Sequence, residues 1–372
     1  MSVDFAITIA QALNDRSPIT TNTLSELEAF VKQPFPSPSA VALARKSSEY
    51  NTQGRRLWNA ATKILQDHDN GEGSGSKVDS SRFGVLLRAF AYFLLDVAHN
   101  TSSRRAKDSD QTVRVFKIAL KASRCCLDNN DLDLAFKLLE SCSKYISAWD
   151  EATPVIRVAD SERNNEDILI SRLTSEFYLY RMVHASKTGR VDLAEHFFVK
   201  SDIASGRRLD GLLETAAGLC YEIGRSQQHQ KRDESALSWL ERAYQLINDD
   251  DADSSSLENE DLRLAVVASF IECLTGHPST DNTQRAWNLL TSLEQDHGLG
   301  NRMAVLTMQL NILMKAEDID VPAASAAVFR MIRSSVLTDQ TYRTQVTQTP
   351  YMDDLPLTPS QNHAFDLQSQ ES

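Results

Sequence analysis

Proline is nearly absent from the middle of this chain. Between Ser39 and Val321 there are two prolines, Pro154 and Pro278, and the whole chain of 372 residues holds 13 glycines and 10 prolines. Proline interrupts the interior of a helix and glycine weakens it, so long stretches without either favour helices over turn-rich strands. The sequence therefore predicts an all-α protein.

Charge and cysteine content limit the class of protein. The chain carries 51 acidic and 39 basic residues, a formal net charge of −12, which repels phosphate backbones. Its N-terminus lacks the pattern of a signal peptide, and the most apolar run, residues 84–98, is too short to cross a bilayer and contains Arg88. The five cysteines form no C-x-x-C pair, which favours reduced, buried thiols. We expect a soluble intracellular protein that binds neither nucleic acid nor membrane directly.

Apolar residues recur at three- and four-residue spacing and define helices that follow one another in pairs. The expected pairs are residues 115–127 with 132–146, 168–186 with 191–201, 212–225 with 234–247, 262–274 with 284–293, and 302–315 with 323–336. Short polar connections between helices of this length produce antiparallel hairpins. An earlier helix, residues 83–97, is apolar on most sides and is expected to be largely buried.

A row of helical hairpins is typical of tetratricopeptide (TPR) solenoids. In such a repeat, small residues lie where two helices cross and a bulky residue fills the space beside them. The window 217–250 fits best, and the other hairpins share its second-helix alanine. The predicted structural positions are Gly224, Ala236, Leu240 and Ala243 in this window, and Ala135, Ala194 and Ala286 in the others. We predict a right-handed α-solenoid of degenerate TPR-like hairpins.

Segments rich in proline, glycine or polar residues suggest where the chain divides. The expected parts are a helical and flexible N-terminal segment (1–38), N-terminal helices with a Gly/Ser loop (39–108), the TPR-like array (109–337) and a disordered tail (338–372).

Catalysis and metal binding find no support in the sequence. The chain contains no phosphate-binding loop, dinucleotide fingerprint, nucleophile elbow or zinc-protease motif. Asp249, Asp251, Asp253 and Glu260 have the spacing of a calcium-binding EF-hand loop, but Ser254 occupies the position where the loop requires glycine. We therefore predict a non-enzymatic protein without metal or cofactor.

The concave face of a TPR array is formed by the first helix of each hairpin and is the expected binding surface for other proteins. Aromatic and arginine side chains on such a face are typical of binding hot spots. The candidate partner-binding residues are Lys117, Arg124, Glu176, Tyr221, Arg225 and Gln228.

Several short motifs resemble one particular family. They are L-W-N at 57–59, C-Y-E-I-G at 220–224, W-L-x-R-A-Y at 239–244 and L-R-L at 262–264. The chain thereby resembles the meiotic sporulation and synapsis-initiation TPR family, whose animal relatives are testis-expressed TPR proteins. The resemblance extends over about residues 40–337, and residues 212–265 are its most distinctive part.

This resemblance implies a nuclear, chromosome-associated scaffold of the ZMM crossover machinery. Such a protein connects crossover factors to the chromosome axis and promotes assembly of the synaptonemal complex. Family members are longer superhelices, so an array that ends near Val336 is expected to leave an apolar edge exposed.

A general TPR adaptor in a cytoplasmic or nuclear complex is the alternative. A chaperone-tail receptor would need lysine and asparagine at the positions that Tyr221 and Arg225 occupy, which argues against that version of the adaptor.

Overall fold

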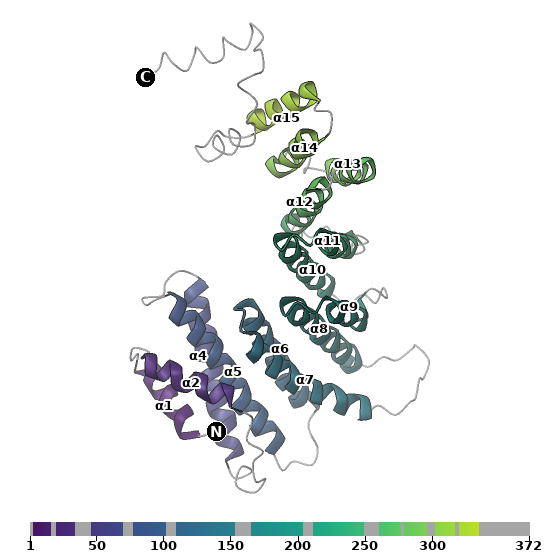
Figure 1. Ribbon diagram of the computed structural model, residues 1–372. Coiled ribbons are helices and arrows are strands. Elements are labelled where there is room, and N and C mark those ends of the chain that lie inside the picture. Colours follow the sequence, from purple (N-terminus) through teal and green to yellow (C-terminus); the bar gives the residue numbers. More distant parts are fainter. Residues whose placement is uncertain are drawn as a thin grey trace, which may run out of the picture. The chain divides into compact units, whose positions relative to one another are not determined.

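The computed structural model describes residues 3–15, 20–33, 46–69, 77–101, 109–152, 165–203, 211–248, 260–276, 279–295, 302–316 and 320–334. Within these ranges the regular structure consists of helices, without strands, which confirms the all-α prediction (Figure 1). The helices are α1 (Val3–Asn14), α2 (Thr21–Lys32), α4 (Ser47–Asp69), α5 (Lys77–Thr101), α6 (Ser109–Asp128), α7 (Leu132–Ala152), α8 (Asn165–Lys187), α9 (Val191–Lys200), α10 (Leu212–His229), α11 (Asp233–Asn248), α12 (Glu260–Gly276), α13 (Thr280–Gln295), α14 (Met303–Lys315) and α15 (Val321–Ser334).

Successive helices pack as hairpins. Helix α6 contacts α7, α8 contacts α9, α12 contacts α13, and α14 contacts α15, while α6 and α8 link the first two of these pairs. The predicted helices agree with the observed ones to within a few residues at most ends; the largest differences are at α5 and α6, which begin earlier than predicted at Lys77 and Ser109, and at α7, which continues to Ala152. This arrangement is that of an α-solenoid with TPR-like hairpins, as predicted. The handedness of the superhelix stays a prediction.

Three hairpins close with the same backbone turn. Asn130, Gly189 and Lys231 each follow a first helix with positive φ angles of 58°, 77° and 57°. Each provides the left-handed residue of a Schellman motif, in which two backbone N–H groups satisfy carbonyls of the last helical turn. The paired bonds are Asp131 N to Cys126 O with Asn130 N to Leu127 O, Arg190 N to Ala185 O with Gly189 N to Ser186 O, and Arg232 N to Gln227 O with Lys231 N to Gln228 O.

The three turns also stand at the same distance from the predicted alanines. Ala135, Ala194 and Ala236 each lie five residues after the left-handed residue of the turn, and the backbone N–H of each donates to the residue four positions earlier. All three side chains are fully buried. Turn and core position therefore recur in one register, as expected of repeats built from the same unit.

The chain divides into two compact units, residues 1–219 and 220–372, and the division falls inside α10. The four parts predicted from the sequence stay predictions. Residues 34–45, 70–76 and 335–372, where proline-rich, glycine-rich and tail segments were expected, lie mostly or wholly outside the described residues.

The core of the first unit is centred on α5. Nearly every residue from Phe83 to Ala98 is buried, as predicted for this helix. Helix α1 packs on α4 and α2 on α5 (Figure 1), and the rings of Phe5 and Phe30 stack at a centroid distance of 4.4 Å beside Phe90. The N-terminal helices thus extend the core of this unit.

A polar network is buried between α5 and α7. The Asp96 carboxylate accepts hydrogen bonds from the hydroxyls of Tyr145 and Tyr92, and the Tyr92 hydroxyl lies 2.7 Å from Ser141 Oγ. Burial raises the pKa of Asp96, although the bond from Tyr145 opposes this shift. Because such partners must meet in one geometry, the network fixes the register of the two helices.

The second unit contains two apolar clusters. The larger joins α11, α12, α13 and α14 around Leu240, Val267 and Leu290, and the smaller joins α14 and α15 around Leu306 and Ala327. On α15, Val321, Phe329 and Ile332 remain about two-fifths exposed; the apolar edge predicted at the end of the array stays a prediction.

The five cysteines form no disulfide; four are buried, as predicted, and Cys125 is partly exposed. In the part of the chain that the structure describes, no helix combines the length and apolar character needed to span a bilayer.

Candidate protein-binding surfaces

Two predicted partner-binding residues of the first unit surround one tyrosine. Arg124 on α6 pairs with Asp128 at 2.8 Å, and Glu176 on α8 accepts a hydrogen bond from the Tyr180 hydroxyl at 2.6 Å. The pKa of Tyr180 is raised chiefly by burial and next by the charge of Glu176, and Arg124 opposes the shift. The structure therefore brings Arg124 and Glu176 together. Lys117 is exposed two turns earlier on α6.

The three candidates of the second unit all lie on α10. Arg225 Nη1 donates to Gln228 Oε1 at 3.0 Å and to Glu272 Oε2 of α12 at 2.9 Å, and Tyr221 packs partly buried against the larger apolar cluster. These contacts place Arg225 between consecutive hairpins. A role in partner binding stays a prediction for all six residues.

The small residues predicted from the repeat pattern lie inside the hairpins. Ala243, Ala286 and Leu240 are fully buried, as are the three alanines that follow the turns. A Cβ atom on Gly224 would lie 2.8 Å from Leu240 Cγ and 2.9 Å from Leu240 Cδ2. Glycine at this position allows α10 to approach α11 more closely than a side chain would permit.

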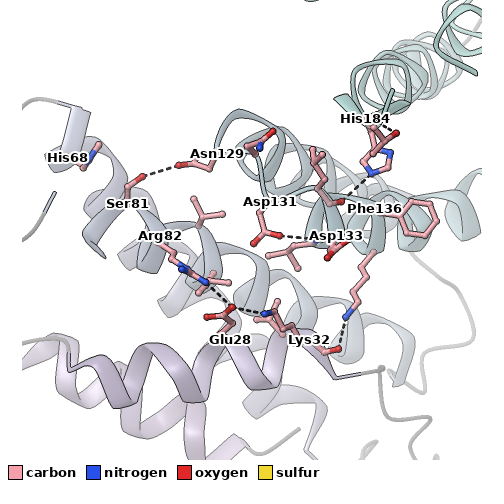
Figure 2. A pocket seen from close by; sticks show the side chains of 18 residues that line it. Glu28, Lys32, His68, Ser81, Arg82, Asn129, Asp131, Asp133, Phe136 and His184 are labelled. Atoms are coloured by element: carbon pink, nitrogen blue, oxygen red, sulfur yellow. Dashed lines mark hydrogen bonds and ion pairs between the residues drawn. The ribbon is translucent and has the colours of Figure 1, made fainter. Parts of the chain in front are cut away.

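A groove of about 1150 Å³ opens in the first unit, between the C-terminal end of α2, α5, the α6–α7 turn and the end of α8 (Figure 2). Its charged groups are largely engaged with each other. Glu28 accepts bonds from Lys32 at 2.7 Å and Arg82 at 2.8 Å, and the bond from Lys32 is the main cause of its lowered pKa. Lys137 Nζ donates to the backbone oxygen of Lys32 at 2.6 Å.

The described side chains that line the groove do not form a grouping typical of catalysis. Its histidine on α8, His184, has Nε2 3.2 Å from the backbone oxygen of Leu132, and burial lowers its pKa. Among the described residues no group of three or more histidine, cysteine or carboxylate side chains is placed to hold a metal ion.

Beside the groove lies a surface that sequence reasoning missed. We call it the aromatic patch and define it as Phe136, Tyr178, Arg181, Phe197 and Lys200. The Arg181 guanidinium lies 5.8 Å from the ring of Phe136 and 4.9 Å from that of Phe197, and Lys200 Nζ lies 5.7 Å from the ring of Tyr178. Tyr178 and Phe197 are stacked at 6.4 Å. The three- and four-residue spacing of Phe177, Tyr178 and Arg181 is the signal that could have revealed it.

The fold is that of a helical-repeat protein. The model of one family, described as "SPO22: Meiosis protein SPO22/ZIP4 like", matches residues 184–348, somewhat less than half of the chain. The resemblance to a meiosis-specific family predicted from the sequence is confirmed over this stretch, which runs from the end of α8 through α15. Neither the curated proteins nor the solved structures include one that matches the chain.

Proposed function

We propose that this protein is a non-catalytic interaction scaffold in meiotic chromosome synapsis and crossover recombination. The observation that carries the proposal is the match of residues 184–348 to a family of meiosis proteins. The hairpins support it physically, because stacked repeats offer extended surfaces to other proteins without a catalytic site. On this proposal the protein acts in the nucleus on chromosomes, and its partners are crossover and chromosome-axis proteins.

Localisation in meiotic cells tests the proposal. A fluorescently tagged full-length chain should form discrete foci along chromosome axes in meiotic prophase, and deletion of the gene should lower crossover frequency and gamete or spore viability. Transcripts that do not change on entry into meiosis, together with diffuse cytoplasmic signal, would contradict the proposal and favour a general adaptor.

A separate experiment tests whether the protein is non-catalytic. A scaffold acts stoichiometrically, so rescue of the deletion strain should decrease in proportion as the protein is expressed at lower levels. Full rescue by trace amounts of protein would point to an enzyme.

A further inference from the structure

Arg181 is an unusual cation in the first unit. Its side chain is partly buried, and burial lowers its pKa. Three phenylalanine rings, those of Phe136, Phe177 and Phe197, lie within 6 Å of the guanidinium carbon. No residue that the structure describes accepts a hydrogen bond from Arg181 or forms an ion pair with it.

A guanidinium has five N–H donors, and no nitrogen of Arg181 is a buried atom without a partner, so its donors remain accessible to a binding group. Its neighbours increase the local positive charge. Arg190 is close enough to oppose protonation of both Arg181 and His184, and Lys200 lies over Tyr178. Glu140 favours the Arg181 charge through space without forming an ion pair. Arg181, Arg190 and Lys200 therefore give this part of the first unit a local excess of positive charge.

The rings around Arg181 make the site ready to bind. They restrict the movement of the side chain, so less conformational entropy is lost when a carboxylate binds the guanidinium with two hydrogen bonds. One ring, that of Phe136, is 43% exposed, although large apolar side chains are usually covered. A fixed arginine next to an exposed aromatic ring is a typical composition for a binding hot spot.

We propose that the aromatic patch binds a segment of a partner protein that carries an aspartate or glutamate beside a large apolar side chain. The carboxylate would accept from Arg181 and the apolar side chain would cover Phe136. The guanidinium carbon and the Phe136 ring are 5.8 Å apart. Residues at i and i+3 or i+4 of a helix have Cβ atoms separated by about 5–6 Å, so one turn of a partner helix matches this spacing.

The net charge of −12 makes the patch selective for short segments. Long-range repulsion disfavours strongly acidic proteins, so recognition depends on a local contact in which the cation is partly removed from water.

The inference deepens the proposed scaffold function. It is tested with purified protein, so that its failure and the failure of the meiotic role are distinguishable.

The probe is a random 12-residue peptide library displayed on phage and selected on the immobilised full-length chain. Selected peptides should share an acidic residue next to, or one helical turn from, Leu, Phe or Trp. Synthetic copies of the selected sequence are then titrated by fluorescence polarisation against variants of the chain. Arg181→Gln should weaken binding about tenfold or more. Arg181→Lys keeps the charge but loses the paired N–H donors that bind a carboxylate with two hydrogen bonds, so it should also weaken binding.

Phe136→Ala provides a second variant with little risk to folding, because its ring is among the most exposed large apolar groups. It should weaken binding by several-fold, whereas Lys121→Gln, which removes an exposed cation of α6, should leave binding unchanged. Selected peptides without acidic residues, binding that survives Arg181→Gln and Phe136→Ala, or the absence of any enriched sequence would each overturn the proposal.

Discussion

Replacement of Gly224 by alanine tests the packing that underlies the hairpins. The new Cβ would lie 2.8 Å from Cγ and 2.9 Å from Cδ2 of Leu240, and 3.4 Å from the carbonyl oxygen of Ala236. Carbon atoms in contact prefer about 3.5–4.0 Å. Leu240 is fully buried in the larger apolar cluster, so a shift of its side chain disturbs a close-packed region. We expect an overpacking cost of about 1–3 kcal/mol.

Gly218 on the same helix provides a matched control. Alanine forms helices better than glycine by about 1 kcal/mol, and both substitutions gain this term. No atom of the described residues lies within 4 Å of a Cβ placed on Gly218. The difference between the two variants isolates the steric cost, so Gly224→Ala should be less stable than Gly218→Ala by about 1–3 kcal/mol.

The measurement is urea-induced unfolding followed by far-UV circular dichroism, with equal m-values as the condition for comparison. Adding Leu240→Ala to Gly224→Ala should relieve the clash. The double variant should then be less destabilised than the sum of the two single changes by about 1 kcal/mol or more. Equal stability of the two alanine variants would refute the idea that a small residue is needed where α10 crosses α11.

Three further predictions concern the turns, the buried carboxylate and the thiols. Lys231→Gly should stabilise the chain by about 1 kcal/mol in urea unfolding, because Lys231 has a φ of 57°, whereas Gly189→Ala at φ 77° should destabilise it by a similar amount. Burial raises the pKa of Asp96 in the folded state, so the folded chain holds its proton to higher pH than the unfolded chain. The free energy of unfolding should therefore fall as pH rises from the ordinary carboxyl range through the folded pKa, and Asp96→Asn should flatten this part of the pH profile. Iodoacetamide at pH 8 should modify Cys125 before the other cysteines, as followed by mass spectrometry, because Cys125 is partly exposed. Burial raises the pKa of Cys126 and Cys142, and that of Cys273 to about 11, so their thiols should react more slowly. Early labelling of Cys142 would contradict the buried packing of α7.

The helices and their pairing were predictable because they depend on local and periodic signals. Apolar spacing and the scarcity of proline determined α6 to α15 within a few residues at most ends. The shared turn was less accessible. Lys231 takes the left-handed conformation that favours glycine or asparagine, so residue type alone gave no sign that this turn repeats those at Asn130 and Gly189.

Surface residues were harder to interpret than core residues. Arg124 and Arg225 were chosen by their repeat position, and both form ion pairs within their own unit. Arg181 was not chosen, although it lacks an acceptor among the described residues. Whether an arginine is paired depends on neighbours from other helices, and the periodicity of one helix does not contain that information.

The division between predictable core and unpredictable surface follows from how repeats are built. Three hairpins have a small residue at the crossing and a left-handed residue at the turn, and Ala135, Ala194 and Ala236 provide the small residue in one register. Exposed positions are under no such constraint, so each hairpin can carry a different surface on the same frame. A scaffold gains its specificity at these positions. The residues most useful for assigning partners are consequently the ones that the repeat pattern leaves open, and in the first unit the aromatic patch is where they are concentrated.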